Sequence, residues 1–254
     1  MSTFNAGLEI EGIVFIGLTF LLAGFVKGVV GLGLPTVAVG LLGLVMPPAQ
    51  AAALLVAPSM VTNVVQLFSG PRFGQLLQRL WPMLAAICAG TWICAALVPA
   101  TLMAHATNAL GVALIFYAIL GLAAVKLNVP RRAEGWAAPL AGLVTGAITA
   151  VTGVFVIPAV PYLQGLGLDK ESMVQALGLS FTVSTIALAV SLALGGALLH
   201  MPVLGASVLA LAPALGGMLF GQWLRHRISA ERFRKLFFSG LLLLGADLAL
   251  RGAF

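Results

Sequence analysis

Long apolar runs follow one another along the whole chain, and charged residues are confined almost entirely to the short links between them. Only 8% of the 254 residues are charged, whereas a soluble domain carries about a quarter. So little charge cannot cover a surface that faces water, so the chain is predicted to be an integral membrane protein. The runs are continuous and rich in Leu and Ala. They predict helices, because strands of a membrane barrel would alternate over about 10 residues.

Ten apolar segments can be delimited along the chain. Several reach the length of about 20 residues that a membrane-spanning helix needs, whereas the second, sixth and seventh fall short. Short segments survive in lipid only where protein buries them or where they line a cavity. These three are therefore predicted to be half-helices or re-entrant segments. The ten segments are 12–30, 31–46, 49–69, 78–99, 102–125, 136–150, 152–167, 172–197, 201–223 and 236–250.

Basic residues gather in three links and so predict a topology. Of the 13 basic residues, ten flank the third, fifth and ninth segment ends. The positive-inside rule places these links in the cytoplasm, and both chain termini then lie outside. The first eleven residues contain no basic residue, so the first segment is expected to stay in the mature protein. The ten basic residues are Arg72, Arg79, Lys126, Arg131, Arg132, Arg225, Arg227, Arg232, Arg234 and Lys235.

This topology makes the first five segments run opposite to the last five, and short matches pair the two halves. AGFVKG at 23–28 shares four of six residues with AGLVTG at 141–146. PSMVTN at 58–63 occupies the place of LSFTVS at 179–184. The chain is therefore predicted to form one all-α membrane domain of two inverted repeats, each starting with broken or re-entrant helices. The two predicted repeats are residues 1–127 and 128–254.

Polar side chains interrupt the third and eighth segments in related patterns. Four in the third segment share one helix face: Ser59, Thr62, Asn63 and Gln66. Such side chains can join helices through hydrogen bonds of about 1–2 kcal/mol each, or they can line a polar cavity. Four together beside a proline favour a cavity that holds an oxyanion, with packing as the alternative. The eighth segment repeats the pattern with Ser180 and Ser184, and Gln175, Thr182 and Thr185 lie nearby.

Glycines mark the start of each half in two different ways. Gly24-xxx-Gly28 and its counterpart Gly142-xxx-Gly146 fit close packing of two helices. Other glycines permit a break in the helix, which would expose free N–H groups and a positive helix end to an anion. The glycines interpreted as breaks beside the substrate are Gly31, Gly33 and Gly153.

Two charged residues lie inside apolar segments. Lys27 is the only basic residue deep in one, and two alternatives are open for it. Its ammonium could extend to the membrane surface, or it could attract an anion into a cavity. Asp247 could form an ion pair with Arg251 one helical turn later, or it could couple transport to protons.

Enzymatic and nucleic-acid functions lack support in the sequence. There is no HExxH motif, no P-loop and no serine with a nearby histidine. Cys88 and Cys94 fit packing roles, and no His/Cys cluster has metal-ligand spacing, so neither a metal nor a cofactor is expected. The basic residues lie at segment ends, where membrane topology uses them, so their charge does not indicate nucleic acid.

Two long stretches resemble the repeats of the TauE/SafE sulfite exporter family. The first is LLAGFVKGVVGLGLPTVAVGLLGLVMPPAQAAALLVAPSMVTNVVQ, and the second is AGLVTGAITAVTGVFVIPAVPYLQGLGLDKESMVQALGLSFTVST. The resemblance covers nearly the whole chain in segment order and length. It implies a multi-pass permease of the bacterial inner membrane that exports sulfite or organosulfonates such as sulfoacetate. In that membrane, the topology from the basic links makes both termini periplasmic.

Residues and resemblance together predict a secondary transporter that exports a small sulfur-containing anion by alternating access. The membrane potential favours anion exit by about 2.3 kcal/mol per charge per 100 mV. An anion channel, a permease for another small organic anion and a structural membrane protein are the alternatives. The expected partners are the anion and the lipid bilayer, with a homo-oligomer left open. The candidate substrate-binding residues are Lys27, Gly31, Gly33, Ser59, Thr62, Asn63, Gln66, Gly153, Gln175, Ser180 and Ser184.

Overall fold

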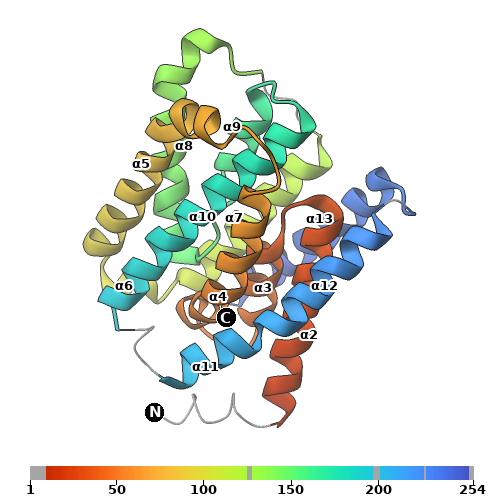
Figure 1. Ribbon diagram of the computed structural model, residues 1–254. Coiled ribbons are helices and arrows are strands. Elements are labelled where there is room, and N and C mark those ends of the chain that lie inside the picture. Colours follow the sequence, from red (N-terminus) through yellow and green to blue (C-terminus); the bar gives the residue numbers. More distant parts are fainter. Residues whose placement is uncertain (1–9, 125–127, 197–200, 226, 252–254) are drawn as a thin grey trace.

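The computed structural model describes residues 10–124, 128–196, 201–225 and 227–251, and every regular element in these ranges is a helix (Figure 1). Seven helical stretches there are long and apolar enough to cross a membrane, which confirms an all-α membrane protein. The first half contains α2 (Ile10–Val30), α3 (Leu34–Leu42), α4 (Pro48–Leu67), α5 (Phe73–Leu97), α6 (Ala100–Met103) and α7 (Ala106–Leu122). The second half contains α8 (Arg131–Thr152), α9 (Ala159–Gly165), α10 (Lys170–Leu194), α11 (Met201–Leu209), α12 (Leu211–Leu224) and α13 (Ala230–Leu250).

The helices break at the glycines that were expected to permit it. Gly31 and Gly33 adopt φ of 83° and 107° between α2 and α3, and Gly153 ends α8 with φ of 73°. Glycine takes these left-handed angles at no steric cost. The helices that follow the breaks, α3 and α9, have 9 and 7 residues. The second and seventh segments are therefore too short to span, as predicted.

The prediction that the sixth segment is also short is wrong. It was delimited as 136–150, but α8 runs from Arg131 to Thr152 and has 22 residues. The charged stretch RRAEG forms the first turns of this helix, and Glu134 in it accepts two hydrogen bonds from Arg79 of α5, at 2.7 and 2.9 Å. A prediction from hydropathy ends the apolar segment where charged residues begin. The helix nevertheless continues through these residues, because Arg79 pairs with Glu134 in the charged turn.

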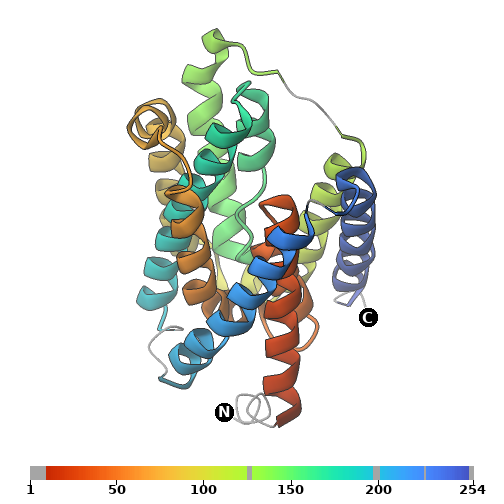
Figure 2. The ribbon, with the colours of Figure 1, turned by 45° about the vertical axis from the view of Figure 1, so that its right-hand side comes forward.

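The most extensive helix contacts connect the two halves. α2 packs on α12 and α8 on α5, so the first helix of each half lies against the fourth segment of the other. α4 packs on α10, and α7 packs on α13 (Figures 1 and 2). This exchange of contacts between the first and fourth segments is what two equivalent halves would make. That the two halves are inverted relative to each other stays a prediction.

Glycines allow two of these pairs to come very close. A Cβ atom on Gly24 of α2 would lie 2.0 Å from the carbonyl oxygen of Ala214 in α12. One on Gly146 of α8 would lie 2.3 Å from the carbonyl oxygen of Ile87 in α5. Close packing is therefore the role of the Gly24-xxx-Gly28 and Gly142-xxx-Gly146 motifs, in keeping with small residues at membrane helix contacts.

The basic links meet at one end of the molecule, which we call the basic end. Arg72, after α4, forms an ion pair of 2.5 Å with Asp169, the residue before α10. Arg234, near the start of α13, donates a hydrogen bond of 3.0 Å to the carbonyl oxygen of Gly121 at the end of α7. The side of the membrane that this end faces stays a prediction.

Asp247 and Arg251 form the ion pair considered for them, with 2.6 Å between Asp247 Oδ2 and Arg251 Nε. Arg251 also donates to the carbonyl oxygen of Leu44, which follows α3. Both side chains of the pair are about half exposed in the protein. This pair holds the end of α13 against the link between α3 and α4.

Candidate anion-binding site

The ammonium of Lys27 is buried inside the protein, one turn before α2 ends. Its side chain donates hydrogen bonds to Thr62 Oγ1 at 3.0 Å and to Asn63 Oδ1, both on α4. The residue is only 4% exposed, so it does not extend to the membrane surface. Among the described residues it takes part in no salt bridge. A buried ammonium held only by neutral oxygens lacks a negative partner.

Asn63 connects the Lys27 ammonium to α10. Its Nδ2 group donates to Ser59 Oγ at 2.9 Å and to Thr185 Oγ1 at 3.2 Å. Ser59 and Thr185 also share a hydrogen bond of 3.1 Å. The polar stripe on α4 therefore faces the interior and joins α2 to α10 through Asn63. For Ser59 and Asn63 this is the packing role that was the alternative to a cavity lining.

Pro58 leaves the polar stripe intact although it lies inside α4. A proline in a helix removes one backbone hydrogen bond and leaves the carbonyl four residues earlier without a donor. Ser207 of α11 supplies the missing donor to Leu54, at 2.9 Å from the carbonyl oxygen. The same hydroxyl accepts a bond from the backbone N–H of Ala57 at 3.1 Å. The proline therefore fixes α4 against α11 just before the stripe begins.

Gln66 connects the stripe to the first helix break. Its Nε2 group donates to the carbonyl oxygen of Gly31, the left-handed residue after α2, at 2.9 Å. Gln66 Oε1 is buried without a hydrogen-bond partner in the described part of the chain. Gly33, the second glycine of the break, caps α3 and lies against Val26 and Phe237. The amide of Gln66 thus stabilises the break, and its Oε1 atom remains available to accept a hydrogen bond.

A cavity of about 270 Å³ is lined in part by Lys27, and we call it the Lys27 cavity. Charged groups in its lining are Lys27 and Arg225, and no acidic residue of the described chain contributes to it. Its other polar lining residues are Gly31, Thr62, Gln66, Ser69 and Gln222. Positive charge and neutral donors without a carboxylate make this cavity suited to an anion.

The predicted residues of the second half are arranged differently. Ser180 Oγ and Ser184 Oγ on α10 are fully buried and have no partner among the described residues. Gln175 uses its whole amide at the link between α4 and α5. It donates to the carbonyl oxygens of Leu67 and Gly70 and accepts from the backbone of Arg72. These bonds give Gln175 a structural role.

The second helix break is closed by hydroxyl groups of its own. Thr145, the sequence counterpart of Lys27, donates to the carbonyl oxygen of Ala141 and accepts from the N–H of Ala159, the first residue of α9. Gly153 lies against Ala52 of α4, whose Cβ would be 2.7 Å from a Cβ at this position. The second break therefore has no cation equivalent to Lys27.

Thr185 is the contact that sequence reasoning did not select. Counting 121 positions from Asn63 leads to Ser184, but the rotation of α10 brings Thr185 to the Asn63 amide instead. Thr185 also donates to the carbonyl oxygen of Phe181 at 2.7 Å, which leaves its oxygen free to accept. The only signal in the sequence was its place beside Ser184.

Comparisons with known proteins agree with the resemblance described above. No curated protein and no solved structure matched the chain. The family model described as Sulfite exporter TauE/SafE matches residues 16–248. Since this match spans most of the 254 residues, from the middle of α2 to the end of α13, the chain belongs to the TauE/SafE sulfite exporter family.

Proposed function

We propose that the protein is a secondary transporter that exports a small sulfur-containing anion, either sulfite or an organosulfonate such as sulfoacetate. The observation that carries the proposal is the Lys27 ammonium, which is buried, lacks a carboxylate partner among the described residues and belongs to a residue that lines a cavity. An anion in this cavity would supply the missing negative charge. Membership of a sulfite exporter family supports a sulfur oxyanion as the substrate class.

The neutral donors around Lys27 suit the shape of a sulfur oxyanion. Its charge is spread over several oxygens, each of which can accept hydrogen bonds from different directions. Ser180 and Ser184 are fully buried and are not in the lining of the Lys27 cavity. Their hydroxyls have no partner in the described chain, so they can donate to an anion once movement of α4 against α10 opens a path to them. The proposed binding residues are Lys27, Gly31, Ser59, Thr62, Asn63, Gln66, Ser180, Ser184 and, in addition, Thr185.

Alternating access is supported by the pairing of helices between the halves. In transporters built of inverted repeats, one repeat moves against the other around a central site. α4, which carries the polar stripe, packs on α10, and this contact supports a site between the proposed repeats 1–127 and 128–254. With the basic end in the cytoplasm of a bacterial cell, both termini are periplasmic and the membrane potential drives the anion out.

The test is export of sulfite from proteoliposomes loaded with the anion. Saturable export with counterflow supports a carrier, whereas a flux that rises linearly with concentration and shows no counterflow supports an anion channel. Ser180→Ala and Ser184→Ala remove hydroxyls without partners in the described chain, so both variants should fold. If these serines bind the anion, each should raise the KM for sulfite by about 5- to 10-fold.

A matched control is Ser191→Ala, on the same helix but outside the polar stripe. Its flux should equal that of the unmodified protein. If Ser180→Ala, Ser184→Ala and the double variant all transport sulfite with unchanged KM and rate, the proposed site is wrong. Export of carboxylates but of no sulfur oxyanion would show that the substrate class is wrong.

A further inference from the structure

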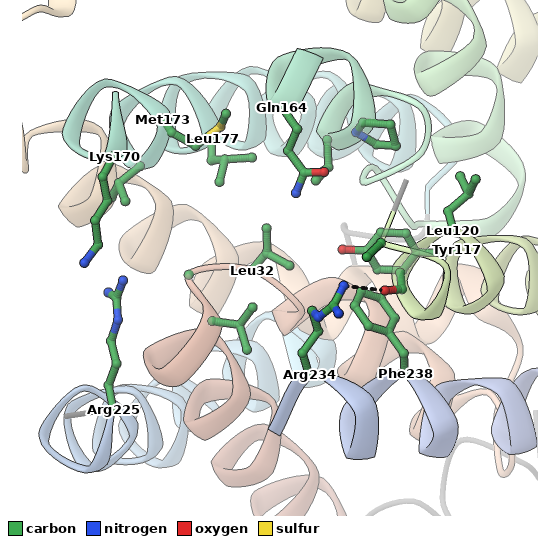
Figure 3. A pocket seen from close by; sticks show the side chains of 17 residues that line it. Leu32, Tyr117, Leu120, Gln164, Lys170, Met173, Leu177, Arg225, Arg234 and Phe238 are labelled. Carbon is green, nitrogen blue, oxygen red and sulfur yellow. Dashed lines mark hydrogen bonds between the residues drawn. The ribbon is translucent and has the colours of Figure 1, made fainter. Parts of the chain in front are cut away.

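A second and larger cavity of about 670 Å³ lies at the basic end, and we call it the basic-end cavity. It is lined by the end of α2, by parts of α7, α9, α10 and α13, and by Arg225, directly after α12 (Figure 3). Much of its wall is apolar, including Leu32, Leu120, Val160, Met173, Leu177 and Phe238. Cavities that bind organic molecules have this size and this mainly apolar lining, with a few directed polar groups. A bare sulfite ion would leave most of this wall without contact.

Tyr117 supplies a directed polar group inside this cavity. The residue is 3% exposed, its ring packs edge-on against Phe238, and its hydroxyl has no partner in the described chain. In Figure 3 this hydroxyl and the amide of Gln164 are directed toward the cavity, although neighbouring atoms cover the hydroxyl oxygen itself. An unpaired buried hydroxyl costs free energy, so its retention here indicates a group that a ligand can satisfy.

Positive charge lines the cavity at both ends. Lys170 of α10 and Arg225, directly after α12, point toward one another across one end (Figure 3). Neither forms a salt bridge with another described residue. Arg234 lies near Tyr117 at the other end, with one N–H group bonded to Gly121. Two like charges that face each other repel, and an anion between them would turn repulsion into attraction.

The basic-end cavity adjoins the Lys27 cavity. Gly31, Val174 and Arg225 line both. Arg225 can therefore contact an anion on either side of this shared wall. A ligand held at the basic end lies beside the path to the Lys27 ammonium.

We propose that the basic-end cavity is a second anion-binding site, which captures organic anions that carry an apolar body. Lys170 and Arg225 bind the anionic head group, Leu32, Leu177 and Phe238 pack against the apolar body, and Tyr117 bonds to a polar atom of the ligand. Binding of an organic anion in the basic-end cavity does not depend on the proposed function. Its role as a capture step before the Lys27 cavity does rest on the proposed function. A free organic anion and an anionic lipid both have an anionic head group and an apolar body, so either could bind in this way.

The test is binding of methanesulfonate and hexanesulfonate to the purified full-length protein, measured by calorimetry. Hexanesulfonate should bind about tenfold more tightly or better, because its longer chain buries more apolar surface. The double variant Lys170→Gln/Arg225→Gln should weaken hexanesulfonate binding by about tenfold or more, since both charges are removed. Tyr117→Phe keeps the ring but removes the hydroxyl, and it should weaken hexanesulfonate binding by about threefold. The double variant Arg132→Gln/Lys235→Gln, whose residues do not line the cavity, should bind normally.

Lys27→Met separates this inference from the proposed function, because it should keep hexanesulfonate binding at the basic-end cavity even if it abolishes transport. Equal affinity for the two sulfonates, or unchanged hexanesulfonate affinity in the Lys170→Gln/Arg225→Gln variant, would overturn the inference. The lipid source is tested in nanodiscs of phosphatidylcholine with and without phosphatidylglycerol. If phosphatidylglycerol blocks hexanesulfonate and stays bound to the unmodified protein but not to the double variant, the cavity holds a lipid head group and the capture role is wrong.

Discussion

Replacing Lys27 with methionine should strongly reduce transport and leave the fold intact. Methionine has about the length of lysine without the charge, so it fills the same space between α2 and α4. Two effects on stability oppose each other. Removing a buried ammonium relieves a desolvation cost of several kcal/mol. It also leaves Thr62 Oγ1 and Asn63 Oδ1 without this donor, at about 1–3 kcal/mol for each unsatisfied atom. The free energy of unfolding should therefore change by less than about 2 kcal/mol.

The effect on anion binding should be much larger than the effect on stability. A hydrogen bond to a charged group contributes about 1.5–3 kcal/mol, which corresponds to about 10- to 150-fold in affinity. No other charged side chain in the described structure bonds to Lys27, although Arg225 lines the same cavity and keeps part of its positive charge when Lys27 is replaced. Sulfite export at concentrations below KM should fall by the same factor.

The assay combines sulfite efflux from proteoliposomes of equal protein content with thermal unfolding in detergent. Lys235→Met is the matched control, because Lys235 is 62% exposed and pairs only with Glu231 on its own helix among the described residues. Lys27→Gln is a second variant that keeps a donor for Asn63 without the charge, so it tests charge separately from packing. Near-normal efflux by folded Lys27→Met and Lys27→Gln would refute the reasoning, since the ammonium would then not meet the anion.

Three further substitutions test the fold around the site. Gly28→Ala would place a Cβ atom 2.2 Å from a carbonyl oxygen of α12 and should destabilise the protein by about 1–3 kcal/mol in thermal unfolding, whereas Gly17→Ala, with open space beside it, should not. Gly153→Ala forces alanine into φ of 73° and should cost about 1–2 kcal/mol in the same measurement. The Ser172 N–H and hydroxyl, and then Arg72, lower the pKa of Asp169. That carboxylate therefore stabilises the fold above its unfolded pKa of about 4 and loses this effect as the pH falls through its lower folded pKa, so Asp169→Asn should flatten the loss of thermal stability on acidification.

Much of the fold could be predicted because lipid leaves few alternatives. Continuous apolar runs must become helices, and glycines at Gly31, Gly33 and Gly153 mark the places where left-handed angles end them. The length of α8 could not be read from hydropathy, because Arg131 and its neighbours belong to a helix whose charged turn is held by Arg79 of another segment. That interaction is tertiary and leaves no periodic signal.

The candidate site was predicted in part for the same reason. Spacing alone placed the α4 stripe on one face, and the structure buries all four of its side chains. Spacing could not give the rotation of α10 about its axis, which brings Thr185 rather than Ser184 to Asn63. Tyr117 gave no signal either, because a single tyrosine in an apolar segment is ordinary. Its unpaired hydroxyl is visible only once the helices around it are assembled.

The two helix breaks differ in whether their own side chains satisfy them. In the second break, Thr145 bonds to the first residue of α9, so its polar groups satisfy one another and need no ligand. In the first break, Lys27 occupies the counterpart position and bonds to α4 rather than to the start of α3. The threonine completes a rigid support, whereas the lysine carries a charge that nothing in the described protein neutralises. The first break therefore supplies the cation, whereas the second is closed by its own hydroxyl groups.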